Sequence, residues 1–198
     1  MDTLLIASTN PGKLREMKAL LAYLRVKLIS PADMGIQLSV TEDGSTYAEN
    51  AAKKAQAYCQ ASGLITLADD SGLEVDALKG KPGLYSARFS GKPDATDADR
   101  RAYLLEQLAG IAHPWTAHFH CTVVIMSPDG QQFYHEGICP GEIIPTERGN
   151  DGFGYDPIFL LPASGKTMAE LRMDEKNRLS HRARAILAAR PTLERLFA

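Results

Sequence analysis

The chain has 198 residues, of which 44% are hydrophobic and 23% are charged, as is typical of a globular rather than a disordered protein. A net charge of -2 provides no positive field for nucleic acid, and three widely spaced cysteines fit neither a disulfide framework nor a CxxC zinc site. No apolar run is long enough to cross a bilayer. We therefore expect one domain, residues 1–198, in the reducing cytoplasm, with no nucleic-acid or membrane partner.

The first predicted elements are a short buried strand over Thr3–Ala7, a polar turn and a helix. The turn consists of Ser8, Thr9, Asn10, Pro11, Gly12 and Lys13. A loop of small polar residues that leads into a helix can cradle phosphate, because the first helical turn leaves backbone N–H groups without partners. The loop is not of the Walker A type, since Leu14 follows the lysine. An ordinary capped helix start is the alternative interpretation.

A second helix is predicted between Thr46 and Gly63. Thr46 to Glu49 has the capping-box pattern that starts a helix, and glycine commonly follows a helix end. Glu42, in the acidic loop before this helix, is a candidate metal ligand. The alternative is that its carboxylate is simply solvated, as most glutamates are.

Two adjacent acids, Asp69 and Asp70, follow a predicted buried strand over Leu64–Ala68. The segment Asp69 to Gly72 is expected to form a turn at the carboxyl end of this strand, where ligands gather in open α/β sheets. Carboxylate oxygens suit magnesium, which takes one or two protein ligands together with phosphate oxygens and waters. A solvated Asx turn would explain the same residues.

The remaining elements are predicted from turn and periodicity signals: a helix over 96–108, strands over 117–126, 132–135 and 158–161, and helices from Thr167 and over 178–189. We expect the hairpin strand at 132–135 to end there, because the next segment contains the strand-breaking residues Gly137, Pro140 and Gly141. The mixed order of strands and helices predicts an α/β fold of the mixed α+β kind, with a mixed sheet.

A glycine-rich loop over 149–157 carries two aromatic residues. Phe153 or Tyr155 could stack on a nucleobase, and Gly154 permits a close approach of the backbone. Asp156 could accept hydrogen bonds from the N–H groups of a base. Packing of the aromatic rings into the core explains the same composition.

Basic residues near the C-terminal end could read the carbonyl oxygens of a base. Lys176, His181 and Arg182 are the candidate donors. Lys176, Ser180 and Arg184 would share one face if this segment were a continuous helix. A solvated basic face is the alternative interpretation.

In their order along the chain, these motifs resemble the inosine/xanthosine triphosphate pyrophosphatase family, which clears non-standard purine nucleotides. The resemblance spans Ile6 to Arg184, through the segments Ser8–Lys13, Thr46–Lys53, Ala68–Leu73, Gly83–Phe89, Phe153–Phe159, Gly165–Thr167 and Ser180–Arg182. It implies a long twisted mixed sheet with flanking helices that form two lobes around a nucleotide cleft. It also implies a homodimer that uses Mg²⁺ to cleave ITP, dITP or XTP into the monophosphate and pyrophosphate.

The resemblance assigns roles to single residues. The loop Ser8–Lys13 would hold phosphate, Glu42 and Asp70 would bind the metal, and Asp70 would also be the catalytic base. The positions that match substrate contacts are Ser71, Phe153, Gly154, Tyr155, Asp156, Lys176, His181 and Arg182. Lys53 resembles a phosphate-facing lysine, and Thr9 stands where many relatives have glycine.

Base selection is expected to depend on hydrogen bonding to the purine 6-position. Donors from His181 and Arg182 would pair with the carbonyl of hypoxanthine or xanthine and be left unpaired against the amino group of adenine. Two alternatives are a related pyrophosphatase for modified pyrimidine or methylated nucleotides and a non-catalytic nucleotide sensor. The His181–Arg182 pair favours the purine enzyme, and the presence of both Glu42 and Asp70 favours catalysis.

Overall fold

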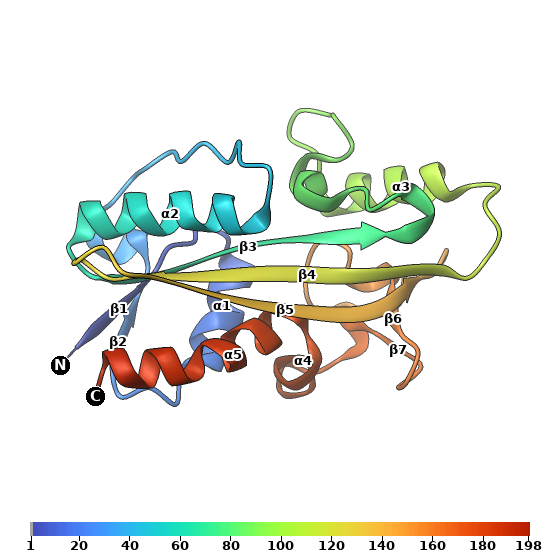
Figure 1. Ribbon diagram of the computed structural model, residues 1–198. Helices are drawn as coiled ribbons and strands as arrows, with labels where there is room; N and C mark the ends of the chain where they lie inside the picture. The colour runs from blue at the N-terminus through green and yellow to red at the C-terminus, as the bar shows by residue number, and fades with distance from the viewer. Residues whose placement is uncertain (1) are drawn as a thin grey trace. The chain divides into compact units, whose positions relative to one another are not determined.

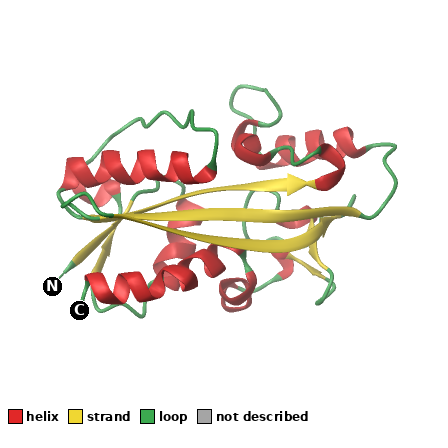
Figure 2. Ribbon diagram, viewed as in Figure 1, coloured by secondary structure: helices red, strands yellow, loops and turns green. Residues whose placement is uncertain are grey.

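The computed structural model describes residues 2–198 and contains a seven-stranded mixed sheet with helices (Figures 1 and 2). The strand order is β2-β1-β3-β4-β5-β6-β7. The predicted mixed α/β fold is therefore confirmed. Among the residues described, no helix is both long and apolar enough to span a membrane.

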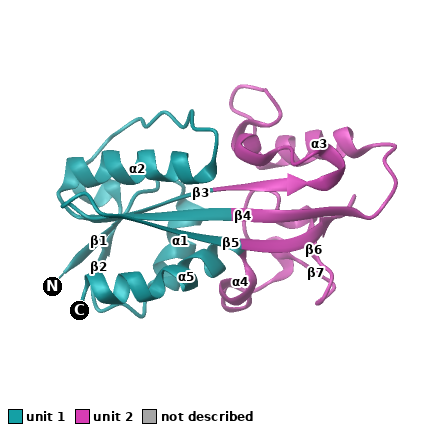
Figure 3. Cartoon of the chain, in the orientation of Figure 1, with its two compact units in different colours: residues 1–70, 121–137, 181–198 teal, residues 71–120, 138–180 magenta. Residues whose placement is uncertain are grey.

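The chain divides into two compact units, coloured separately in Figure 3. Unit 1 comprises residues 1–70, 121–137 and 181–198, and unit 2 comprises residues 71–120 and 138–180. Three strands contribute residues to both units: β3 (Ile65–Val75), β4 (Trp115–Met126) and β5 (Gln132–Ile143).

Unit 1 is a layered α/β arrangement around parallel strands. Its other elements are β1 (Thr3–Ile6), α1 (Pro11–Leu20), β2 (Lys27–Ile29), the 3₁₀ turn η1 (Pro31–Met34), α2 (Tyr47–Ser62) and α5 (His181–Leu196). Strand β1 pairs in parallel with both β2 and β3, so that Leu4 lies opposite Leu28 on one side and Ile65 on the other.

The strands of unit 1 bury side chains on both faces. Leu4 and Ile6 pack with residues of α1 and α5, whereas Leu5 and Ala7 pack with residues of α2. Side chains alternate along a strand, so a strand covered on both faces is apolar at successive positions, as β1 is from Leu4 to Ile6.

Unit 2 packs its core between strands and a long helix. Its other elements are η2 (Asp76–Leu78), η3 (Gly83–Arg88), α3 (Asp97–Leu108), η4 (Asp156–Ile158), β6 (Phe159–Leu161), β7 (Lys166–Thr167), η5 (Met168–Glu170) and α4 (Met173–Leu179). Leu104 and Leu108 of α3 belong to the same core cluster as Phe119 and Phe159, whose ring centroids are 4.5 Å apart.

The predicted start and end of α2 are confirmed. The side chain of Thr46 accepts a hydrogen bond from the N–H group of Glu49, and Gly63 ends the helix in the left-handed conformation. The carboxylate of Glu49 accepts hydrogen bonds from the N–H and hydroxyl groups of Ser45. Thr46 thus caps the start of the helix, and Glu49 holds Ser45, the residue before the cap, through hydrogen bonds.

The turn predicted at Asp69–Gly72 is wrong. Strand β3 continues through these residues to Val75. The acidic and small residues suggested a solvated turn, but both aspartates are buried and hydrogen-bonded. Partners from elsewhere in unit 1 therefore override the local turn signal.

The interruption predicted at Gly137, Pro140 and Gly141 is also wrong, because β5 runs from Gln132 to Ile143. A Cβ atom at Gly137 would lie 2.2 Å from the carbonyl oxygen of His181, and one at Gly141 would lie 2.5 Å from that of Leu160. These glycines thus permit close packing against α5 and β6 rather than a turn.

The C-terminal basic residues do not share a continuous helix. Helix α4 ends at Leu179, and Ser180 has an extended backbone before α5 begins at His181. Lys176 and Arg184 consequently lie on different helices, and the face predicted for them does not exist.

Candidate active site

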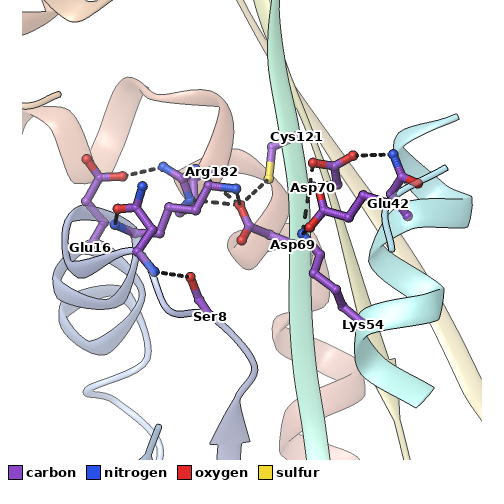
Figure 4. A network of polar contacts seen from close by, with 11 residues as sticks. Ser8, Glu16, Glu42, Lys54, Asp69, Asp70, Cys121 and Arg182 are labelled. Atoms are coloured by element: carbon purple, nitrogen blue, oxygen red, sulfur yellow. Dashed lines mark hydrogen bonds and ion pairs between the residues drawn. The ribbon is translucent and has the colours of Figure 1, made fainter. Parts of the chain in front are cut away.

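The two acids of β3 point to opposite faces of the sheet, because side chains alternate along a strand. Asp69 contacts Arg182 of α5 (Figure 4). It also contacts Lys13 of α1. Asp70 contacts Asn50 of α2 on the other face. Both side chains are buried, but their surroundings differ, and this difference separates their roles.

Asp69 is the centre of a buried ion-pair network. Its Oδ2 atom lies 3.0 Å from Lys13 Nζ and accepts hydrogen bonds from Arg182 Nη2 and Nε at 3.1 and 3.3 Å. Arg182 is 1% exposed, and its Nη1 atom donates to Glu16 of α1. Burial alone would raise the pKa of Asp69, but the surrounding positive charges, first that of Lys13, hold this pKa well below its ordinary value. Asp69 is therefore an ionised link between α1, β3 and α5.

Asp70 faces a lysine that it shares with a second acid. Asn50 Nδ2 donates to Asp70 Oδ2 at 3.0 Å, and Lys54 Nζ lies 4.0 Å from Asp70 Oδ1. The same ammonium group lies 2.8 Å from Glu42 Oε1. Burial raises the pKa of Asp70 above its ordinary value, because it outweighs the opposing charge of Lys54. Although burial lowers the pKa of Lys54, the neighbouring carboxylates outweigh it, and that pKa is raised.

Asp70 and Glu42 fit a magnesium site that substrate completes. Residues 2–198 contain no group of three or more His, Cys, Asp or Glu side chains placed to hold a metal ion. Magnesium usually takes one or two carboxylates and fills its remaining positions with waters and substrate phosphates. Both carboxylates lie within 4.0 Å of the ammonium group of Lys54, so one cation can be close to both.

The predicted phosphate-binding residues are Ser8, Thr9 and Asn10 before α1 and Pro11, Gly12 and Lys13 in its first turn. Asn10 Oδ1 accepts from the N–H group of Lys13 at 3.0 Å, and Ser8 Oγ accepts from that of Asn10 at 3.3 Å. Thr9 is not among the described residues with a positive φ, so the loop accommodates threonine without backbone strain. The loop is a capped helix start, and its binding of phosphate stays a prediction.

The predicted base-contacting loop of unit 2 is organised around Asp156. Its Oδ2 atom accepts hydrogen bonds from the N–H group of Phe153 at 2.9 Å and from Lys176 Nζ at 2.6 Å. The ammonium group of Lys176 also lies 5.1 Å from the centroid of the Phe153 ring, a cation–π contact. Tyr155 is 4% exposed, and its hydroxyl donates to the carbonyl of Ser86. Tyr155 therefore packs in the core, whereas Phe153 is half-buried.

His181 and Arg182 begin α5, and both are buried. The guanidinium group of Arg182 already binds the carboxylates of Asp69 and Glu16, so a base contact by this residue would require it to exchange or share these partners. Ser71, which follows Asp70 in β3, is half-buried. The contacts of these residues with substrate stay predictions.

A model of the Ham1 family matches residues 4–192. The chain belongs to the Ham1 family. It is 45% identical to a protein of Desulforamulus reducens, over 98% of this chain and 96% of that protein, and 47% identical to one of Geobacter sulfurreducens, over 94% of each. Both of these relatives are named dITP/XTP pyrophosphatase.

Solved structures of other Ham1 proteins have the same fold. The HAM1 protein of Coxiella burnetii is 40% identical and superposes with a TM-score of 0.88, over 98% of this chain and all of that one. The Ham1 protein of Staphylococcus aureus is 37% identical, with a TM-score of 0.86 and the same coverage. The resemblance seen in the sequence motifs is thus confirmed.

In this Ham1-family chain, three residues of the candidate site were not anticipated from the sequence. Lys53 was singled out, but its ammonium group pairs with Asp43 and its side chain is 44% exposed. Lys54 instead contacts the two acids, and Asn50 lies one helical turn before it, so their shared face of α2 could have indicated both. Glu16 had no such signal, because it pairs with an arginine 166 positions later.

Proposed function

We propose that this chain hydrolyses the non-standard purine nucleoside triphosphates ITP, dITP and XTP to the monophosphate and pyrophosphate. Relatives that are 45% and 47% identical over nearly their whole length carry the name dITP/XTP pyrophosphatase. The structural observation that carries the proposal is the convergence of Asp70 and Glu42 on one ammonium group, beside the pair of Lys13 and Asp69. This arrangement supplies acids for a metal and cations for phosphate in one unit of the fold.

The phosphate end of the reaction would use residues of α1 and β3. The ammonium group of Lys13 and the N–H group of Gly12 at the start of α1 would bind and orient the triphosphate, and positioning of this kind dominates catalysis of phosphoryl transfer. Asp70 would accept the proton of the attacking water. Burial raises the pKa of Asp70, and a carboxylate with a raised pKa is a stronger base than an ordinary one.

Magnesium is the proposed cofactor, with Asp70 and Glu42 as its protein ligands. When bound, it would supply positive charge that offsets the charge of the triphosphate and its leaving group. Lys54, which contacts both carboxylates, would balance their charge in the absence of the ion.

The base end would use the loop that Asp156 organises. Phe153 would stack on the purine ring, and Asp156 and Lys176 would bind polar groups of the base. His181 would donate to the 6-carbonyl that ITP and XTP share. A site built to make such a hydrogen bond can reject an analogue that cannot make it by about 10⁴-fold.

A pyrophosphate-release assay with ITP, dITP, XTP, ATP and GTP, with and without magnesium, tests this proposal. We expect rapid cleavage of the first three substrates, at least about 100-fold slower cleavage of ATP, and loss of activity without magnesium. Equal cleavage of ATP and ITP would refute the base assignment. Adding a modified pyrimidine and a methylated nucleoside triphosphate to the assay tests the related pyrophosphatases, which a preference for either would favour. Tight binding without turnover would indicate a sensor.

We further propose, from the resemblance to the family, that the protein is a homodimer in the cytoplasm. Light scattering during size-exclusion chromatography should then report twice the chain mass of 21.6 kDa. A mass equal to that of one chain would contradict the dimer.

A further inference from the structure

The loop that contains Phe153 and Asp156 has several glycines with a left-handed backbone conformation. Gly149, Gly152 and Gly154 have φ values of +83°, +80° and +62°, in the left-handed region that favours glycine. Glycine has more conformational freedom to lose on folding than any other residue. A defined position for the Phe153 ring therefore requires contacts that fasten the loop from outside its backbone.

One fastening comes from within the loop. The Asp156 carboxylate accepts from the N–H group of Phe153 and lies so close to Gly152 that a Cβ atom there would be 2.1 Å from Asp156 Oδ2. This contact fixes residues 152 and 153 relative to Asp156. It does not involve the backbone N–H and carbonyl groups of Gly154, which other residues contact.

Helix α3 supplies the second fastening. Asp97 Oδ2 accepts from the N–H group of Gly154 at 2.7 Å, and Arg101 Nη1 donates to the carbonyl oxygen of Gly154 at 2.8 Å. Residues four apart on a helix lie on one face, so a single turn of α3 presents an acceptor and a donor to the same residue. Both contacts involve a charged side chain, which makes them stronger than ordinary hydrogen bonds.

The same arginine reaches the other end of the loop. Arg101 Nε and Nη2 donate to the two carboxylate oxygens of Glu147 at 2.8 and 2.9 Å, a bidentate ion pair. One guanidinium group thus joins Glu147 to Gly154 and closes the glycine-rich segment between them. The Arg101 side chain is 12% exposed and that of Glu147 is 47% exposed, so water competes more for the ion pair than for the part-buried contact with Gly154.

Asp97 is held in place from its other side. Its Oδ1 atom pairs with Arg100, while its Oδ2 atom accepts from Gly154. Although burial raises the pKa of Asp97, the hydrogen bond from Gly154 and the contacts with Arg100 outweigh it and lower this pKa. The acceptor for Gly154 is therefore a fixed carboxylate.

We propose that Asp97 and Arg101 are positioning residues that set the base selectivity of this chain by clamping Gly154, between the ring of Phe153 and the core residue Tyr155. The selectivity part rests on the proposed function. The clamp itself rests on the contacts of Gly154 and Glu147 with α3. The contacts of Asp97 and Arg101 described above are with Gly154, Glu147 and Arg100 rather than with the residues proposed to bind phosphate, so their effect should appear in substrate discrimination rather than in the chemical step.

The test compares Arg101→Met, which keeps the apolar stem and removes the guanidinium group, with Arg101→Lys, which keeps one donor for Gly154. Arg190→Met is the matched control, because Arg190 is a half-exposed arginine of unit 1 in an ion pair with Glu194. Two readouts are the ratio of kcat/KM for ITP to that for ATP, and hydrogen–deuterium exchange of residues 149–156 in the protein without substrate.

Arg101→Met removes the hydrogen bond to Gly154 and the ion pair with Glu147. We expect the ITP-to-ATP ratio to fall about tenfold and exchange in residues 149–156 to rise about tenfold. The main kinetic change should be a higher KM for ITP. Arg101→Lys should recover part of both effects, and Arg190→Met should show neither. A general loss of stability would instead raise exchange throughout the chain and leave the ratio unchanged.

Unchanged exchange in residues 149–156 of Arg101→Met would overturn the clamp. Faster exchange with an unchanged ITP-to-ATP ratio would overturn its role in selectivity. Absence of ITP hydrolysis by the unaltered protein would instead refute the proposed function, together with the selectivity that rests on it, while the exchange comparison would still decide whether α3 holds the loop.

Discussion

Asp69→Asn should lower the stability of the protein, whereas Asp70→Asn should abolish its activity without lowering its stability. Asparagine keeps the size of the side chain and removes its charge. Burial is the largest single influence on the pKa of both acids, but the cations Lys13 and Arg182 together outweigh it at Asp69, whereas burial prevails at Asp70. The two variants therefore separate a structural carboxylate from a catalytic one.

Asp69→Asn should destabilise the protein strongly. It removes the carboxylate that receives two hydrogen bonds from Arg182 and the ion pair with Lys13, and it leaves the buried guanidinium group with Glu16 as its remaining carboxylate. Breaking one partner out of a buried ion pair typically costs about 3–5 kcal/mol. Because the amide oxygen can still accept one hydrogen bond, we expect a loss of about 3 kcal/mol, or about 6–12 °C in Tm for a chain of this size.

Asp70→Asn should leave Tm unchanged or raise it. The raised pKa of Asp70 means that the folded protein disfavours its ionised form, so an uncharged side chain removes a cost. The amide can still accept from Asn50, and Lys54 keeps Glu42. Loss of activity without loss of stability is the usual pattern for a residue that is strained for function.

Thermal unfolding of the two variants and the unaltered protein, followed by circular dichroism without magnesium, measures this contrast. The metal is left out so that its binding does not add to the stability of the folded state. An Asp69→Asn variant within about 1 kcal/mol of the unaltered protein would refute the structural role of the network. Equal destabilisation by both substitutions would show that the two acids are not distinguished by their surroundings.

Three further predictions follow from the contacts of unit 1. Asn50→Ala should lower kcat about tenfold or more, because Asn50 Nδ2 donates to Asp70 and Asn50 Oδ1 accepts from the N–H group of Gly44. The control Gln56→Ala, at an exposed position on the same helix, should not lower kcat. Equal kcat values for the two variants would contradict this role of Asn50. Gly137→Ala should cost at least about 2 kcal/mol in urea unfolding, since its Cβ atom would meet α5; a neutral effect would show that α5 can move away. The lowered pKa of Asp69 contributes stability above its ordinary pKa that is lost as pH falls through its folded value, so unfolding experiments below about pH 4 should show a fall in stability that is smaller in Asp69→Asn.

The boundaries of α2 and the starts of α1 and α3 could be predicted because their signals are local. Thr46 and Gly63 satisfy the end groups of the helix that they flank, whatever surrounds it. The same holds for Asn10 before α1 and for Thr96 and Asp99 at the start of α3. Such residues act within a few positions of themselves, and one sequence is enough to read them.

The two strand errors have one physical cause. Glycines and aspartates favour turns when nothing else acts on them. In β3 the carboxylates of Asp69 and Asp70 are satisfied by α1, α2 and α5, and in β5 the absence of a side chain at Gly137 lets α5 approach closely. Both reasons lie in elements distant in sequence, which residue patterns within the strand do not reveal.

The composition of the candidate site was predicted better than its connections. Glu42 and Asp70 were named as the acids, and the structure brings both to one ammonium group. Whether Lys53 or Lys54 contacts these acids depends on which face of α2 packs against β3. The partner of Arg182 likewise depends on tertiary packing, because Asp69, which accepts from its guanidinium group, lies 113 positions earlier in the chain.

The most direct test of the account is to identify the products that the unaltered protein and Asp70→Asn form from ITP in the presence of magnesium. We predict one IMP and one pyrophosphate for each ITP consumed by the unaltered protein, and a loss of turnover of at least about 10³-fold in a folded Asp70→Asn variant. Release of orthophosphate and IDP, or near-normal turnover by the variant, would contradict the account.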